Sequence, residues 1–136
     1  HGSVLFSATG ITRSYTGAIT LAGNTTGYTF TTNGQSIAST FTVNGIGSGW
    51  TLGSALSSSS SATFTNGSFN TGNYNCTNTY WTNSGTGTNS VTLGSSTISL
   101  NNGIVLASTF DFSKTTGLTF NAGTSNINLV QKRWKL

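Results

Sequence analysis

Acidic side chains and histidines are almost absent from this chain. Asp111 is the one acidic residue and His1 the one histidine, and charged residues make up 4% of the 136 positions, against about 25% in an ordinary soluble domain. Catalysis by proton transfer depends mainly on His, Asp and Glu, and metal sites need several of these residues or Cys together. We therefore predict no catalytic residue, no metal site and no cofactor, and expect that the chain is not an enzyme.

Cysteine occurs once and proline not at all. Cys76 cannot form an intramolecular disulfide, and its neighbours in NYNCTNTYW include no base that would activate the thiol. We expect it to fill an apolar position in a strand. No run of about 20 apolar residues is present, so we predict no membrane insertion.

The formal charge of +4 is concentrated at one end of the chain. Three of the five cations lie in the closing QKRWKL, and the body holds Arg13 and Lys114. A nucleic-acid site needs cations spread along a face, so we predict no nucleic-acid partner and interpret residues 130–136 as a basic tail. His1–Ser3 resemble the remainder of an affinity tag. We expect one repeat-containing β domain over residues 1–136, as a fragment of a longer protein.

Thr, Ser, Asn and Gly dominate the chain, and apolar residues recur among them with period two. FTV, WTL, VTL, ISL and LTF each alternate a large apolar residue with Thr or Ser, which is typical of short, half-buried strands. Asn-Gly steps at Asn33, Asn44, Asn66 and Asn102 supply the positive φ angles of tight turns. The pattern predicts an ordered all-β chain.

Two internal repeats strengthen this prediction. The segment from Phe30 matches the segment from Phe69 at an offset of about 39 residues, which pairs Phe41 with Tyr80, and WTLGS then falls on VTLGS. LGSSTISL returns as AGTSNINL. Repeats of this length indicate one structural unit stacked on itself.

Two architectures fit short strands in repeated units. One is a parallel β-solenoid (β-helix) or related fibrous β-structure, and the alternative is a β-sandwich of hairpins. Two features favour the solenoid. Each step has one inward apolar residue, and the polar Thr, Asn and Ser positions can stack between coils. The lack of charge agrees, because stacked coils would place like charges against one another.

The run TFTNGSFNTGNYNCTNTYW, followed by SVTLGSSTISL and later by LTFNAGTSNINL, resembles repeats in phage tail-associated and fibre-like proteins and in adhesin-type bacterial surface proteins. The resemblance covers roughly residues 28–129. It implies an elongated β-helical module at an extracellular or virion surface, without catalytic residues. By analogy with fibres, it also implies a homo-oligomer, with a trimer favoured.

Trp81 is the candidate ligand-binding residue. Adjacent strand residues point to opposite faces, and the alignment of Tyr80 with Phe41 places Tyr80 in the core and Trp81 outside. An outward tryptophan can stack on a sugar ring, which makes a glycan- or partner-binding patch around Trp81 one interpretation. The alternative is that the ring packs against a loop or a neighbouring subunit. Trp50 aligns with Val91, which predicts a core position.

We expect a non-enzymatic structural or adhesive segment that self-associates and contacts a cell-surface glycan. Three alternatives stay open: a carbohydrate-binding module, a self-assembling filament subunit and an ice-binding protein. Ice binding would use T-x-T rows at sheet spacing, but the T-x-T steps do not fall at one period. The serine run 57–61 is interpreted as a flexible loop between repeats.

Overall fold

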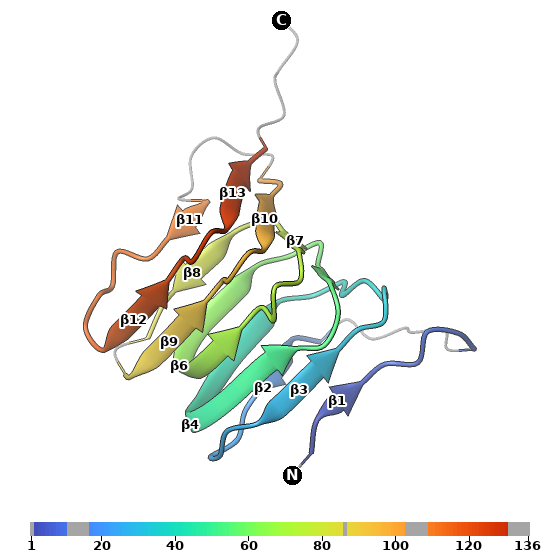
Figure 1. Cartoon of the computed structure of the whole chain (residues 1–136), viewed down its shortest axis with the longest axis horizontal. Coiled ribbons are helices and arrows are strands. Elements are labelled where there is room, and N and C mark those ends of the chain that lie inside the picture. The colour runs from blue at the N-terminus through green and yellow to red at the C-terminus, as the bar shows by residue number, and fades with distance from the viewer. Residues whose placement is uncertain (1, 11–16, 86, 103–108, 131–136) are drawn as a thin grey trace, which may run out of the picture.

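The computed structural model describes residues 2–10, 17–85, 87–102 and 109–130, and every helix or strand assigned within them is a strand (Figure 1). The prediction of an all-β chain is therefore confirmed. His1, Arg13, Trp134 and the basic tail beyond Val130 lie outside the described residues. The strands are β1 (Val4–Leu5), β2 (Ile19–Leu21), β3 (Tyr28–Thr31), β4 (Phe41–Leu52), β5 (Leu56–Ser57), β6 (Ala62–Asn70), β7 (Cys76–Asn78), β8 (Trp81–Asn83), β9 (Asn89–Thr92), β10 (Thr97–Leu100), β11 (Phe110–Asp111), β12 (Leu118–Asn121) and β13 (Asn126–Leu129).

All strand pairs of the described residues are parallel, and the chain winds into a β-solenoid of about 4 turns. We distinguish three faces. Face 1 holds β2, residues 41–44 of β4, residues 62–66 of β6, β8 and β11. Face 2 holds β1, β3, residues 49–52 of β4, residues 67–70 of β6, β9 and β12, and face 3 holds β5, β7, β10 and β13. The solenoid prediction is confirmed, and the sandwich alternative is excluded.

One coil is about half of the repeat seen in the sequence. Phe41 pairs with Ala62, and Ala62 pairs with Trp81, so the two steps are 21 and 19 residues. The 39-residue offset therefore spans two coils. The predicted column of Phe41 with Tyr80 is wrong by one residue, because these two coils together contain 40 residues rather than 39.

The other two alignments are confirmed. Trp50 pairs with Phe69, which pairs with Val91, so WTLGS and VTLGS occupy one column two coils apart. Ile98 of LGSSTISL pairs directly with Ile127 of AGTSNINL. Gly94 and Gly123 occupy the same turn position in LGSSTISL and AGTSNINL, with φ of 58° each.

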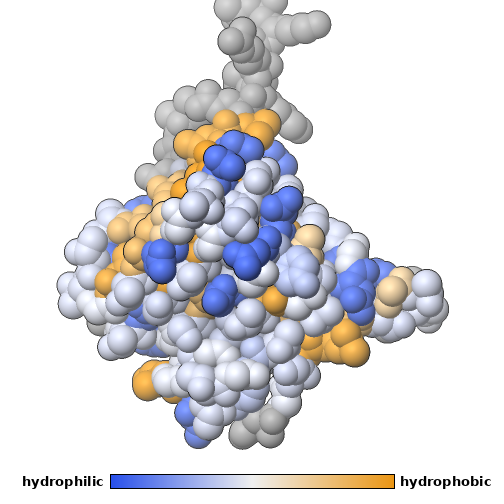
Figure 2. All heavy atoms as spheres, viewed as in Figure 1, coloured by the Kyte–Doolittle hydropathy of each residue, from blue (hydrophilic) through white to orange (hydrophobic). Residues whose placement is uncertain are grey.

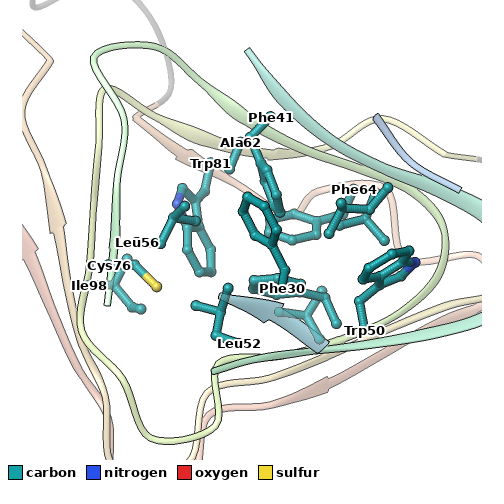
Figure 3. Close-up of a cluster of buried hydrophobic side chains, with 14 of the residues drawn as sticks. Phe30, Phe41, Trp50, Leu52, Leu56, Ala62, Phe64, Cys76, Trp81 and Ile98 are labelled. Carbon is teal, nitrogen blue, oxygen red and sulfur yellow. The ribbon is translucent and has the colours of Figure 1, made fainter. Parts of the chain in front are cut away.

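The core is a column of apolar side chains that point inward from all three faces (Figure 3). Aromatic rings contact one another along it: the ring centroids of Phe30 and Phe41 are 5.5 Å apart, and those of Phe64 and Trp81 are 5.1 Å apart. Contacts of this kind add about 0.5–1.5 kcal/mol beyond area burial. The alternation in FTV, WTL and ISL thus directs every second side chain into one continuous core.

The corner between faces 2 and 3 is built from residues with positive φ. Gly72, Gly94 and Gly123 have φ of 60°, 58° and 58°, and the same corner of an earlier coil holds Asn33 at 50° and Gly34 at 78°. The left-handed conformation is open to glycine and tolerated by asparagine. The predicted turn at Asn33-Gly34 is confirmed here.

The serine run 57–61 is a solenoid corner, so the prediction of a flexible loop is wrong. Ser57 belongs to β5, and Ser58 bridges to Ile37 on the neighbouring coil. Ser58 and Ser61 are buried; the Ser58 Oγ donates to the Ser39 carbonyl at 3.0 Å and accepts from the Ser60 N–H at 3.1 Å. At this corner the Ser58 hydroxyl forms hydrogen bonds with backbone groups that lie outside the strands. Amino-acid composition alone does not distinguish such a corner from a flexible loop.

Candidate functional site

Trp81, the predicted outward ligand-binding residue, lies inside the solenoid. Its exposed fraction is 0%, whereas that of Tyr80 is 37%, so the predicted orientations of both residues are wrong. The Trp81 indole Nε1–H donates to the Asn78 Oδ1 at 2.8 Å, and Ala62 of the preceding coil occupies the paired position. A small side chain at Ala62 leaves room for the large indole, and this size pairing is visible only once the register is known. The hypothesis of a ligand patch around Trp81 loses the exposed ring on which it rested.

Two other predicted positions are confirmed. Trp50 is buried, and its ring centroid lies 4.7 Å from that of Tyr28. Cys76 is a buried free thiol in β7, and desolvation raises its pKa to about 12, although a hydrogen bond with the Leu56 backbone lowers it slightly. The thiol is therefore held in its protonated, unreactive form.

Asp111 caps a local turn. Its Oδ1 accepts a hydrogen bond from the Ser113 N–H at 3.0 Å. Hydrogen bonds from Ser113 are the main cause of the lowered pKa of this exposed carboxyl, and the nearby charge of Lys114 contributes less. Asp111 thus stabilises the turn that follows β11.

The outer surface of face 1 carries a ladder of threonines. Thr20, Thr42, Thr63 and Thr82 occupy one row across four successive coils, and the row ends at Asp111. Neighbouring strands of a sheet lie about 4.7–4.9 Å apart. The predicted T-x-T steps do not form one array, since Thr29 is on face 2, Thr63 is on face 1 and Thr77 is on face 3.

A groove of about 500 Å³ runs across the coils beside the corner between faces 1 and 2. We call it the corner groove. Its lining contains hydroxyls, amides, glycines and one large apolar side chain, and none of the lining residues is charged. The lining residues are Thr26, Ile46, Gly47, Ser48, Asn66, Gly67, Ser68, Gly87, Thr88, Asn89, Ser90 and Thr119.

Part of this polar lining is already hydrogen-bonded. The Asn66 Nδ2 donates to the Asn44 Oδ1 at 2.9 Å, and the Ser68 Oγ donates to the Ser48 carbonyl at 3.2 Å. By contrast, the hydroxyls of Thr88, Ser90 and Thr119 have no hydrogen-bond partner within the described residues. These three hydroxyls are free to donate to and accept from a bound molecule.

The C-terminal coil exposes side chains that belong to the core columns. Ile127 and Leu129 are 37% and 57% exposed, although their partners on the preceding coil, Ile98 and Leu100, are completely buried. Phe120 is exposed in the same way above the buried Val91. Apolar surface gathers over β11, β12 and β13 (Figure 2), and among the described strands β12 and β13 each pair on one edge only.

Comparison with protein-family models, with curated proteins and with solved structures finds no match.

Two further observations concern metal sites and membrane spans. The described residues contain no cluster of three or more His, Cys, Asp or Glu side chains that could hold a metal ion, and no helix that could cross a membrane is found among them. Two surfaces stand out: the exposed apolar side chains of the last described coil and the corner groove. In the sequence, the repeat of ISL as INL indicates that a further coil stacks on β10. No feature of the sequence indicates the groove.

Proposed function

We propose that this chain is a non-catalytic structural segment of an extended protein at an extracellular or virion surface, such as a phage tail fibre or bacterial adhesin, and that it works by self-association. The observation that supports the proposal is the last described coil, where Phe120, Ile127 and Leu129 are exposed although their column partners are buried. Solenoid ends need a cap or a partner, because their strand edges and core columns are otherwise open.

A second copy of the chain is the occupant that fits this end best. Full burial of a large apolar side chain contributes about 1.5–3 kcal/mol, so covering the exposed parts of these three side chains favours association. The outer edges of β12 and β13 also offer backbone N–H and C=O groups to another strand. A copy of the same solenoid has strands at matching positions on all three faces.

The size of the assembly distinguishes two forms of self-association. By analogy with fibres we favour a trimer of defined mass, in which three copies meet through the exposed apolar side chains of their C-terminal coils. Head-to-tail stacking of the C-terminal coil on the N-terminal coil of the next copy does not close, so it gives filaments of variable length. The closed trimer corresponds to a fibre segment, and the open head-to-tail stack corresponds to a filament subunit.

Light scattering after size exclusion, at rising protein concentration, tests the proposal. We expect a mass of about three times 14.0 kDa for the full chain. The double substitution Ile127→Lys and Leu129→Lys should return the mass to that of a monomer, since it places charge on the apolar end. Asn128→Lys is the matched control, because Asn128 lies between them on β13 and pairs with the outward Ser99.

Each outcome of this experiment points to a different state of association. A full chain that stays at 14.0 kDa at every concentration would overturn self-association. A mass that grows without limit would replace the trimer with a filament, and an equal loss of mass in the Asn128→Lys control would show that association does not depend on the core columns.

A further inference from the structure

We propose that the corner groove binds a neutral oligosaccharide. This site is separate from the self-associating end, and it does not depend on the oligomer. It also differs from the Trp81 patch predicted from the sequence, because Trp81 does not line the groove.

The chemistry of the lining selects a neutral ligand rich in hydroxyl groups. No Lys, Arg, His, Asp or Glu lines the groove, so no ion pair is available to a phosphate, a sulfate, a carboxylate or an ammonium group. Thr88, Ser90 and Thr119 supply hydroxyls that can both donate and accept. Sugar hydroxyls have the same dual capacity and match them directly.

The direction of the groove favours a sugar chain over an extended peptide. A peptide gains affinity from a sheet by pairing with an open strand edge. Of the strands that line the groove, β4, β6 and β9 have neighbours on both sides, and among the described strands β12 alone leaves an open edge, at the last coil. A ligand that lies across the coils therefore meets no open edge along most of the groove. Ser68, Ser90 and Thr119 stand in one row on successive coils, which presents hydroxyls at the strand spacing of about 4.8 Å to a ligand with repeating units.

A bulge in β4 supplies the apolar wall of the groove. Asn44 pairs with Asn66 and Gly49 pairs with Ser68, so residues 45–48 of β4 stand opposite Gly67 alone. Bulges re-aim side chains and are common beside functional sites. This bulge lifts Ile46 out of the sheet to an exposed fraction of 81%, where its side chain can pack against the C–H face of a sugar ring.

Glycine at position 67 is needed for this arrangement. Gly67 has φ of 88°, and a Cβ there would lie 2.5 Å from both the Gly45 carbonyl oxygen and the Ser48 Oγ. The tight contact lets the extra residues fold over the corner without displacing β6. The groove thus depends on the bulge in β4 and on its close contact with Gly67. The regular coils of the solenoid do not need either feature.

NMR titration of the full, isotope-labelled chain tests the inference. The probes are maltopentaose, cellopentaose, mannopentaose and N-acetylchitopentaose, with sialyllactose as an acidic comparison and a neutral Gly/Ser heptapeptide as a polymer control. We expect at least one neutral pentasaccharide to shift the backbone amides of residues 66–68 and 87–90 with a Kd of about 1 mM or tighter. The acidic sugar should bind no more tightly than its neutral counterparts.

Two substitutions then locate the site. Ser90→Ala should weaken binding about 3- to 10-fold, since a hydrogen bond is worth about 0.5–1.5 kcal/mol. Ile46→Ser should weaken it by a similar factor. Ser99→Ala is the matched control, because Ser99 also lies on the outer side of a strand but on face 3, and it should leave the Kd unchanged.

Three results would overturn the inference. They are no amide shift with any of the four pentasaccharides, shifts that Ser90→Ala and Ile46→Ser leave unaltered, and shifts produced by the heptapeptide alone, which would indicate a protein partner. Light scattering on Ser90→Ala keeps this test separate from self-association, because the substitution should not change the mass of the assembly.

Discussion

At the residue scale, the burial of Trp81 depends on a small side chain at the paired position of the preceding coil. Ala62 stands between Phe41 and Trp81 in one column of face 1, so the smallest member leaves space for the two largest. The indole also satisfies its N–H inside the core through Asn78. Trp81 therefore stabilises the fold and contributes no exposed surface.

Replacement of Trp81 should be far more costly than replacement of its neighbour Tyr80. We expect Trp81→Ala to lower the free energy of unfolding by about 3–5 kcal/mol, because it removes a buried aromatic and leaves a cavity. Tyr80→Ala, at a position 37% exposed, should lower it by about 1 kcal/mol or less. Urea unfolding followed by circular dichroism measures both, and a larger loss for Tyr80→Ala would contradict the register described here.

At the element scale, the corners rather than the strands carry the strictest sequence requirements. At the corner between faces 2 and 3, Gly72, Gly94 and Gly123 have positive φ. A Cβ on any of these glycines would lie less than 3 Å from an atom of the preceding coil. A Cβ on Gly94 would lie 2.1 Å from the Asn73 Oδ1, and that oxygen accepts a hydrogen bond from the Ser95 N–H at 3.0 Å. The corner thus links one coil to the next through Asn73.

Gly94→Ala should destabilise this corner by about 1–3 kcal/mol, which combines the cost of a left-handed alanine with the displacement of Asn73. Gly17→Ala is the matched control, since a Cβ there has nothing within 4 Å and its φ is not positive. Thermal unfolding should show a lower Tm for Gly94→Ala and almost no change for Gly17→Ala. Equal Tm values for the two variants would mean that the corner tolerates a side chain.

At the scale of the whole molecule, each coil is stabilised by the coils on either side of it. The central strands β4, β6 and β9 have neighbours on both edges, whereas β12 and β13 have one described neighbour each. Stability in such stacks is approximately a sum of repeat and interface contributions. The C-terminal coil is therefore the least supported part of the described C-terminal half.

Amide hydrogen exchange should show this gradient directly. We expect the amides of β6 and β9 to exchange most slowly and those of β12 and β13 to exchange faster in dilute protein, because local opening needs fewer broken contacts there. Association through the C-terminal coil should slow exchange in β12 and β13 selectively. Uniform exchange across these four strands, unchanged by concentration, would contradict both the gradient and the proposed interface.

The sequence by itself determined the all-β fold class, the stacked repeat and the inward positions of Trp50 and Cys76. Period-two alternation makes strands because successive side chains point to opposite faces, and repeats such as LGSSTISL and AGTSNINL place Ile98 and Ile127 in one column. Those statements need only local geometry and self-similarity. The same local information also placed Cys76 and Trp50 inside correctly.

Only the tertiary structure decided the coil length, the orientation of Trp81 and the corner groove. A register error of one residue exchanges the inward and outward faces of a strand, so the miscounted column of Phe41 reversed Tyr80 and Trp81. The groove depends on the bulge at residues 45–48 and on its contact with Gly67 of the next coil. Such features arise between coils, where the number of residues per turn decides which side chains meet.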